Sequence, residues 1–350
     1  MGPVFVKVRL PPPGFSRSVL APRFGYVGCG RLTRGVVLAG GAINRRLATE
    51  GTPCTRAGTG TRERWATGEA MADRGAGGKR RIRECANILY RESGLHPDVH
   101  IVLGSGLGAI AERVEDAVRI PFGGLPGFPP TSVEGHEGCF VIGRIGGTPV
   151  LVQSGRFHFY EGVGPGVVAA PVRLGRALGA ETLVLTNAVG GIRRDLVPGS
   201  IVLVDDHINL MFRAPLEGPV AEGEERFPDM SRPCDPRLME LAESQALKTG
   251  TAMTRGTYAG VAGPHFETPA EVRALGAAGA DVVGMSAVPE VTIARAGGQR
   301  VLAFSVVTNH AAGLGAGAID HEGVMAYAVE AGERLGVLLE RIVPLVGGDS

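Results

Sequence analysis

Apolar and polar residues follow a regular pattern from Ile82 onward. A helix-like segment over 82–94 ends on Gly94, a residue type that commonly terminates helices, and the apolar strand-like run VHIVLG (99–104) follows it. Runs bounded by Gly, Pro or Asp predict further strands at 139–145, 149–153, 182–186, 200–205, 257–262, 281–284 and 300–307. The segments between many of them predict helices at 166–178, 235–248, 268–278 and 287–297.

The last part of the chain predicts one long helix with a single apolar face. Its apolar residues recur at steps of four and three, at Val324, Ala328, Ala331, Leu335, Leu338 and Ile342. Because helical patterns alternate with strand patterns along the chain, the sequence predicts an α/β domain. Several strands are apolar throughout, as expected of a central sheet that helices cover on both sides.

The first 77 residues lack this regularity. They are rich in Arg, Gly, Pro and Thr without a sustained period of 3.6 or 2, which predicts a largely disordered extension (1–77) ahead of a domain over 78–350. Residues 1–70 hold eleven Lys and Arg against three Glu, whereas the rest of the chain has a formal charge of −7. An organelle transit peptide, or a gene start over-extended upstream of Met71, fits the same composition.

The composition of the whole chain argues against several classes of protein. A formal net charge of +1 over 350 residues disfavours a general nucleic-acid or membrane-surface role. Five scattered cysteines without a C-x-x-C pair suggest neither a disulfide framework nor a zinc site, and they fit a reducing cytosol. No run approaches the roughly 18 apolar residues of a membrane span. We therefore expect a cytoplasmic protein without a metal site and without a membrane or nucleic-acid partner.

The stretch HIVLGSGLGAI, residues 100–110, places a glycine turn directly after a predicted strand. Gly104, Gly106 and Ala109 satisfy the G-x-G-x-x-G/A spacing of a dinucleotide-binding turn at a helix N-terminus. Such a turn needs an acidic residue about 20 positions further on, and the region FGGLPGFPPT has none. What remains is a backbone anion site with one hydroxyl, Ser105, suited to a single phosphate. A tight turn without a ligand is the alternative.

A second polar pattern lies in QSGRFHFYEG, residues 153–162. Arg156 and His158 alternate with Phe157 and Phe159, so on an extended chain both donors project to one side and the rings to the other. An Arg fork together with a His donor suits a phosphate or a carboxylate. The alternative is a half-buried strand whose Arg and His only reach solvent.

Two further stretches favour a ligand site. In VLTNAVGGI, residues 184–192, small residues allow a ligand to approach the backbone closely, although another turn between a strand and a helix fits equally. In GPHFET, Glu267 precedes a helix for which Thr268 and Pro269 form the N-cap and first turn. Glu267 would then either bind a ligand or favour the helix dipole.

The motifs GSGLG, GRFHFYEG, TNAVGG, GPHFET, GADVVGMS and VTN, in this order, resemble the trimeric purine nucleoside phosphorylase family over roughly residues 80–347. The resemblance implies a single α/β domain with a central mixed, partly barrel-like sheet flanked by helices on both sides, assembled as a homotrimer. It also implies an enzyme of purine salvage that uses inorganic phosphate as co-substrate, without a metal or an organic cofactor. Its products would be the free base and ribose 1-phosphate.

The resemblance assigns each part of the substrates to residues of this chain. Phosphate would be bound by Ser105, Arg156, His158, the amide of Ala188 and Ser286, with His136 close behind. Ribose would lie among Tyr160, Phe266 and Met285, with His321 near its 5′-hydroxyl. The base would lie against Val283 and Thr308 and bind Glu267 and Asn309. The catalytic residues would be Asn309, Glu267 and His321.

Residue 309 decides the implied substrate. Breaking an N-ribosidic bond gives the sugar oxocarbenium character, so a nearby anion and a stabilised leaving base both help. Asn309 would donate to the purine N7, and Glu267 would accept from N1–H or the 2-amino group. The adenine-cleaving methylthioadenosine phosphorylases have an Asp where this chain has Asn309, and Asn can donate to a 6-oxo group. The implied substrates are therefore inosine, guanosine and their 2′-deoxy forms.

The chain departs from the family pattern at Val189 and in two extra imidazoles, His265 and His310, which we interpret as structural or solvent-facing and not catalytic. Val189 replaces the second alanine of the more usual Asn-Ala-Ala-Gly-Gly run, which predicts a tighter pocket wall. The polar, Gly- and Pro-rich segment 212–230 has the composition of a lid loop. In the family this region covers the neighbouring subunit's sugar with an aromatic residue, for which Phe227 is the candidate here.

Three other functions remain open at this point. The nearest is a methylthioadenosine phosphorylase or another nucleoside phosphorylase of the same fold. A nucleotide-binding module without chemistry would use the glycine turn for NAD or a mononucleotide. An RNA-associated protein would use the basic leader, although that leader lacks the interleaved aromatic residues of a stacking platform.

Overall fold

The computed structural model describes residues 76–130, 137–315 and 321–346. These residues all belong to one compact unit of the chain. The predictions of disorder, of a transit peptide and of a later gene start concern residues 1–77, of which residues 1–75 lie outside the described part.

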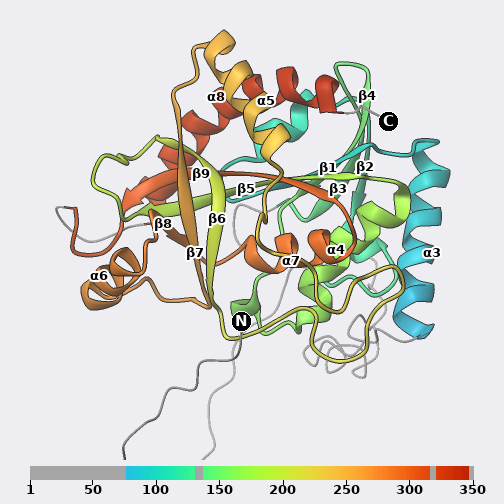
Figure 1. Cartoon of the computed structure of the whole chain (residues 1–350). Coiled ribbons are helices and arrows are strands. Elements are labelled where there is room, and N and C mark those ends of the chain that lie inside the picture. Colours follow the sequence, from blue (N-terminus) through green and yellow to red (C-terminus); the bar gives the residue numbers. More distant parts are fainter. Residues whose placement is uncertain (1–75, 131–136, 316–320, 347–350) are drawn as a thin grey trace, which may run out of the picture. The chain divides into compact units, whose positions relative to one another are not determined.

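A nine-stranded sheet runs through the described residues in the order β2-β3-β4-β1-β5-β8-β7-β6-β9 (Figure 1). Parallel and antiparallel pairs both occur: β1 is parallel to β4 and β5, whereas β3 is antiparallel to β2 and β4. The strands are β1 (Val99–Leu103), β2 (Glu115–Pro121), β3 (Cys139–Ile145), β4 (Thr148–Ser154), β5 (Thr182–Gly191), β6 (Ile201–Leu210), β7 (Met253–Val261), β8 (Val282–Gly284) and β9 (Arg300–His310).

One part of this sheet closes on itself. β5 pairs antiparallel with β8 and parallel with β9. The hydrogen-bonded ladder continues from β9 through β6 and β7 back to β8. These five strands form a barrel, from which β1, β4, β3 and β2 extend as an open sheet. The predicted mixed, partly barrel-like sheet is confirmed.

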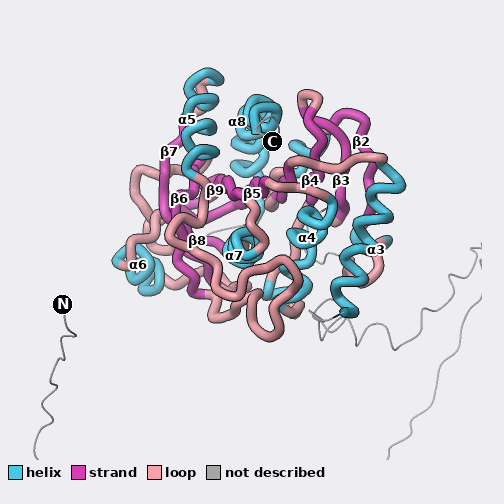
Figure 2. Tube along the Cα trace, turned by 45° about the vertical axis from the view of Figure 1, so that its right-hand side comes forward, coloured by secondary structure: helices cyan, strands magenta, loops and turns pink. Residues whose placement is uncertain are grey.

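Helices cover both faces of the sheet (Figures 1 and 2). α5 and α8 lie on one side, and α3, α4 and α7 lie on the other. The α-helices are α3 (Ala76–Ser93), α4 (Pro165–Leu178), α5 (Pro236–Thr249), α6 (Pro269–Ala277), α7 (Val288–Ala296) and α8 (His321–Val346), and the 3-10 helices are η1 (Gly108–Arg113), η2 (Phe122–Gly124) and η3 (Phe159–Glu161). Within the described ranges, no helix is long and apolar enough to cross a membrane.

The main core lies between the sheet and these helices. All five residues of β1 are buried, as expected of a strand with neighbours on both edges and helices on both faces. The apolar face predicted for the C-terminal helix is buried at Ala328, Ala331, Leu335, Leu338 and Ile342, each 0% exposed. A smaller core, which includes Val272 and Leu275 of α6, packs against the end of the barrel.

Two elements differ from the sequence-based expectation. Glu115–Pro121 forms the edge strand β2, which was not predicted because most of its side chains are exposed and it lacks an apolar run. The small residues of VLTNAVGGI do not form a turn between a strand and a helix. They continue β5, because its backbone pairs with β9 as far as Gly191 opposite His310.

Candidate active site

The glycine turn after β1 is a β-turn that presents Ser105. The Leu107 N–H donates to the Gly104 carbonyl oxygen at 3.1 Å and closes the turn. Gly106 has φ +76°, a conformation that favours glycine. Gly104 packs tightly on β5, since a Cβ there would lie 2.7 Å from Asn187 Cα. The Gly104 N–H donates to the Thr186 hydroxyl at 3.2 Å, and the chain continues into a 3-10 helix. The turn therefore offers Ser105 to a ligand, but not an α-helix N-terminus.

The segment after β4 places Phe157 and His158 in different surroundings. Phe157 is buried against Phe122, with ring centroids 5.2 Å apart. His158 stacks on Tyr160 at 4.6 Å. The Glu161 carboxylate accepts from the His158 backbone N–H at 2.7 Å and lies 3.1 Å from its Nδ1. Because a carboxylate accepts, it favours the ring hydrogen on Nδ1, and Glu161 thus fixes the orientation of His158.

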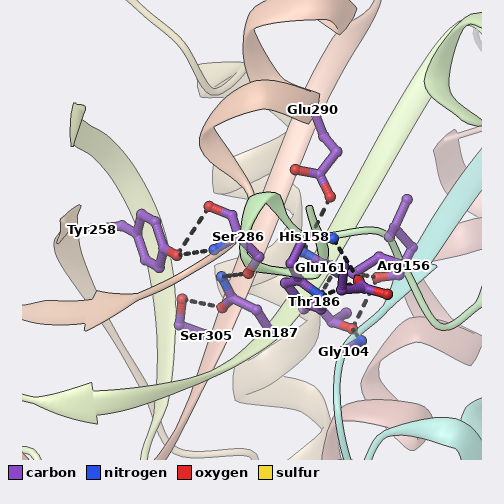
Figure 3. A network of polar contacts seen from close by, with 11 residues as sticks. Gly104, Arg156, His158, Glu161, Thr186, Asn187, Tyr258, Ser286, Glu290 and Ser305 are labelled. Atoms are coloured by element: carbon purple, nitrogen blue, oxygen red, sulfur yellow. Dashed lines mark hydrogen bonds and ion pairs between the residues drawn. The ribbon is translucent and has the colours of Figure 1, made fainter. Parts of the chain in front are cut away.

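Arg156 lies in a different place from the one predicted. Its side chain is 1% exposed and is absent from the pocket lining described below. The guanidinium donates to the carbonyl oxygens of Thr186 and Val102, and it lies 3.4 Å from the Glu290 carboxylate, itself 4% exposed (Figure 3). Charge-assisted bonds of this kind are strong in a buried environment. These partners, contributed by β5, β1 and α7, keep Arg156 behind the pocket wall.

One pocket of about 290 Å³ gathers eleven of the predicted site residues. The ends of β1, β5, β8 and β9 contribute to it, together with the loops that follow β4 and β7. The eleven residues are Ser105, His158, Tyr160, Ala188, Phe266, Glu267, Val283, Met285, Ser286, Thr308 and Asn309. Residues that are remote in the sequence are therefore brought around one cavity large enough for a small molecule.

A chain of polar contacts leads from the barrel to Ser286. Ser305 Oγ donates to Asn187 Oδ1 at 2.7 Å, and Asn187 Nδ2 lies 3.4 Å from Ser286 Oγ (Figure 3). Asn187 on β5 stands directly opposite Ser305 on β9 in the strand register. This contact orients the Asn187 amide so that its nitrogen faces Ser286.

A β-bulge shapes the pocket around Asn309. The register of β5 against β9 shifts between Val189 and Gly190, which places Gly190 opposite Asn309. A Cβ on Gly190 would lie 3.4 Å from both Asn309 Nδ2 and Val283 Cγ1. The Thr308 hydroxyl donates to Asn309 Oδ1 at 3.0 Å. The amide of Asn309 is thus oriented by its neighbour, with the backbone of Gly190 close beside it.

Glu267 precedes α6 but does not cap it. Thr268 is the N-cap, as predicted, and Glu271 completes its capping box. The acid that serves the helix N-terminus is therefore Glu271, and Glu267 lines the pocket instead. Burial raises the pKa of Glu267 above its ordinary value of 4.5.

Two predicted residues lie outside the described part of the chain. These are His136 and the side chain of His321.

The loop over residues 212–230 carries two exposed aromatic side chains. Phe227, the predicted lid residue, is 89% exposed, and Phe212 is 90% exposed with φ +52°. The Arg213 guanidinium carbon lies 5.3 Å from the centre of the Phe159 ring, which ties the start of the loop to the segment that carries His158.

Most of the chain is similar to known phosphorylases. A family model described as the phosphorylase superfamily matches residues 98–344. Purine nucleoside phosphorylase 1 of Geobacillus stearothermophilus is 44% identical over 235 residues, which are 67% of this chain and 85% of that protein. The chain belongs to the purine nucleoside phosphorylase family. It is therefore an enzyme, of the pentosyltransferase class.

Other members of the purine nucleoside phosphorylase family agree with this assignment. The Mycobacterium tuberculosis purine nucleoside phosphorylase is 44% identical over 263 residues, 75% of this chain and 94% of that protein. A crystal structure of a Schistosoma purine nucleoside phosphorylase in complex with hypoxanthine has a TM-score of 0.72 and 37% identity, covering 75% of this chain and 96% of that one. The family and fold predicted from the motifs are confirmed.

Three residues at or near the pocket were not among the predicted site residues. Asn187 and Glu161 lie inside the quoted motifs TNAVGG and GRFHFYEG, where a polar residue among small or aromatic ones could have indicated them. Glu290 gives no such signal, because an acid in the first turn of a helix is ordinary. Its role depends on Arg156, which is remote from it in the sequence.

Proposed function

We propose that this enzyme cleaves the N-glycosidic bond of 6-oxopurine ribonucleosides and 2′-deoxyribonucleosides with inorganic phosphate. The products are the free base and ribose or deoxyribose 1-phosphate. The observation that carries the proposal is that one pocket combines oxyanion-binding groups, Ser105, His158 and Ser286, with a carboxylate and an amide, Glu267 and Asn309.

The course of β5 supports a linear arrangement of the two substrates. Gly104 and Ser286 lie close to Asn187, whereas Val283 and Asn309 lie close to Gly190. Three residues of an extended strand span about 10 Å. A sugar can lie in this interval, with phosphate near Asn187 and the base near Gly190.

In the proposed reaction a phosphate oxygen bonds to C1′ while the bond from C1′ to N9 of the purine breaks. The electron pair of that bond goes to the purine ring, and the proton of the attacking hydrogen phosphate ends on the free base. Asn309 Nδ2 carries two hydrogens: one goes to the His310 carbonyl at 2.9 Å, and the other is shared between N7, where charge collects, and the adjacent 6-oxo oxygen. Glu267 accepts from N1–H. Phosphate is the nearby anion that stabilises the oxocarbenium character of the sugar.

Arg156 takes part in this proposal from behind the pocket wall. A buried guanidinium beside Thr186 adds positive potential at the phosphate end, because charges interact strongly where water is excluded.

The preference for a 6-oxo group rests on Asn309. The Thr308 hydroxyl donates to Asn309 Oδ1, which leaves Nδ2 as the atom for the substrate. A donor suits a 6-oxo group and N7, and it would meet a donor in the 6-amino group of adenosine. The relative from Schistosoma mansoni has been crystallised with inosine and also with adenosine, so the preference has to be measured on this chain.

Assembly, cofactors and location are part of the same proposal. We expect a cytoplasmic homotrimer that needs no metal or organic cofactor. Two Phe side chains about nine-tenths exposed on one loop, Phe212 and Phe227, support a subunit contact, because isolated exposed rings of this size cost solvation free energy. Light scattering tests the trimer, and activity after dialysis against EDTA tests the metal.

The deciding experiment measures base release from inosine, guanosine, adenosine and methylthioadenosine, with and without phosphate. We expect release from the first two, and only with phosphate. Faster release from the 6-amino nucleosides would make the enzyme a methylthioadenosine phosphorylase. Release at an equal rate without phosphate would overturn phosphorolysis. Tight NAD binding without any base release would favour a binding module.

A further inference from the structure

One buried hydroxyl outside the pocket lining contacts the proposed phosphate site. Tyr258, on β7, is 1% exposed. Its phenol oxygen lies 3.0 Å from the Ser286 carbonyl oxygen, to which it donates, and 3.0 Å from the Ser286 backbone nitrogen, from which it accepts (Figure 3). A single hydroxyl thus satisfies both backbone groups of a residue that lines the pocket.

The backbone around Ser286 is held in an unfavourable conformation. The Val288 N–H donates to the Ser286 carbonyl at 2.7 Å, which closes a three-residue γ-turn centred on Ala287. Ala287 has φ +61° and ψ −50°, a region that residues with a Cβ rarely adopt. Strained conformations of this kind persist only where the surrounding structure determines them. Tyr258 is a clear source of that constraint.

We propose that Tyr258 is a positioning residue of the phosphate site, whose hydroxyl holds the Ser286 backbone and so sets where the Ser286 side chain meets phosphate. This inference rests on the proposed phosphate site. Tyr258 itself is not among the residues that line this pocket. It acts through Ser286.

The surroundings of Tyr258 suit this role. Gly284 lets the phenol approach, since a Cβ there would lie 2.8 Å from the Tyr258 oxygen. Burial raises the pKa of Tyr258 to about 12, so the hydroxyl keeps its proton and remains a donor at every pH at which the enzyme is assayed.

The side chain of Ser286 is oriented separately from its backbone. Asn187 Nδ2, itself fixed by Ser305, contacts Ser286 Oγ at 3.4 Å. The Ser286 residue is therefore held by strand β7 through its backbone and by strand β5 through its hydroxyl. Removing the Tyr258 hydroxyl should disturb the backbone contact alone.

The test is Tyr258→Phe, which removes one oxygen and keeps the ring. Two hydrogen bonds are lost, and about 0.5 to 1.5 kcal/mol for each, about 1 to 3 kcal/mol together, corresponds to a roughly 5- to 150-fold rise in the KM for phosphate. We expect the KM for inosine and kcat at saturating phosphate to stay near those of the unmodified enzyme. Thr182→Val is the matched control, because it deletes a buried hydroxyl at the far end of β5.

A second variant separates positioning from stability. Ala287→Gly relieves the strain of the turn. Adding Ala287→Gly to Tyr258→Phe should therefore bring the phosphate KM back toward the value of the unmodified enzyme. A general loss of stability in Tyr258→Phe would not be reversed in this way.

Ser286→Ala distinguishes failure of this inference from failure of the proposed site. If Ser286→Ala raises the phosphate KM but Tyr258→Phe matches the Thr182→Val control, the positioning role is overturned and the phosphate site stands. If Tyr258→Phe raises the KM values for phosphate and inosine equally, the role is also overturned. If Ser286→Ala leaves the phosphate KM unchanged, the phosphate site itself is in the wrong place.

Discussion

The buried ion pair behind the pocket gives the largest expected effect of a single substitution. Arg156 and Glu290 have side chains 1% and 4% exposed, with the closest atoms 3.4 Å apart. Glu290→Ala removes the carboxylate from this pair, while the guanidinium keeps its contacts to the Thr186 and Val102 carbonyl oxygens. Removing one member of a buried pair costs about 3 to 5 kcal/mol, because a buried charge loses an opposite charge that compensated it.

The size of this loss can be read from thermal unfolding. For a domain of this size 1 kcal/mol shifts the Tm by about 2 to 4 °C, so Glu290→Ala should lower the Tm by roughly 6 to 20 °C at fixed protein concentration. Glu333→Ala is the control. Its partner Arg113 lies 2.7 Å away, but the two side chains are 22% and 55% exposed, and such pairs contribute about 1 kcal/mol or less.

A double substitution separates stability from function. Arg156→Met with Glu290→Leu removes both charges, and replacing a buried pair by apolar residues is often neutral for stability. We expect a Tm near that of the unmodified protein. The KM for phosphate should rise, because the Arg156 guanidinium no longer adds positive potential at the phosphate end of the pocket. If Glu290→Ala costs no more stability than Glu333→Ala, the contact is not an effective buried pair and the reasoning fails.

Three further predictions concern the pocket itself. Asn309→Asp replaces the donor at N7, so kcat/KM for inosine should fall by about 10²- to 10³-fold while preference shifts toward 6-aminopurines; an unchanged preference in the substrate panel would contradict the role of Asn309. Glu267 accepts a hydrogen bond from N1–H most strongly when ionised, and burial raises its pKa above 4.5, so kcat/KM for inosine should fall as the pH drops through that raised pKa. The same burial disfavours the charged form in the folded state, so Glu267→Gln should raise the Tm at pH 7 and abolish this acidic limb; a limb that persists would assign it to another group. Gly104→Ala places a Cβ 2.7 Å from the backbone of Asn187, which should lower the free energy of unfolding in urea by about 1 to 3 kcal/mol and raise the phosphate KM. Gly108→Ala is the control, because a Cβ at Gly108 meets open space. Equal effects of the two substitutions would refute the close packing at Gly104.

Much of the fold follows from local sequence patterns. The helix α4 is predicted to within one residue, because Pro165 and Gly179 mark its two ends, and β3 is predicted with its observed bounds, because it is a short and mostly apolar run. β2 was missed, since an edge strand needs no apolar run. The continuation of β5 to Gly191 was left open, because glycines indicate a turn unless a neighbouring strand pairs with them.

The site divides in the same way. The sequence by itself determined which residue types are available: the motifs contain a hydroxyl, an imidazole, a carboxylate and an amide, and eleven of the named residues line one pocket. Those chemistries belong to the side chains, and the resemblance of the motifs to a known family assigned each side chain to phosphate, ribose or base.

Only the tertiary structure decided which partners these groups have. The side chain of Arg156 is held out of the pocket lining by Glu290, and Ser286 is held by Tyr258, in both cases through contacts between residues remote in the chain. Hydrogen bonds and ion pairs act over a few ångströms in space and have no fixed spacing in sequence. The direction in which a buried polar side chain points is therefore set by the strands and helices that surround it.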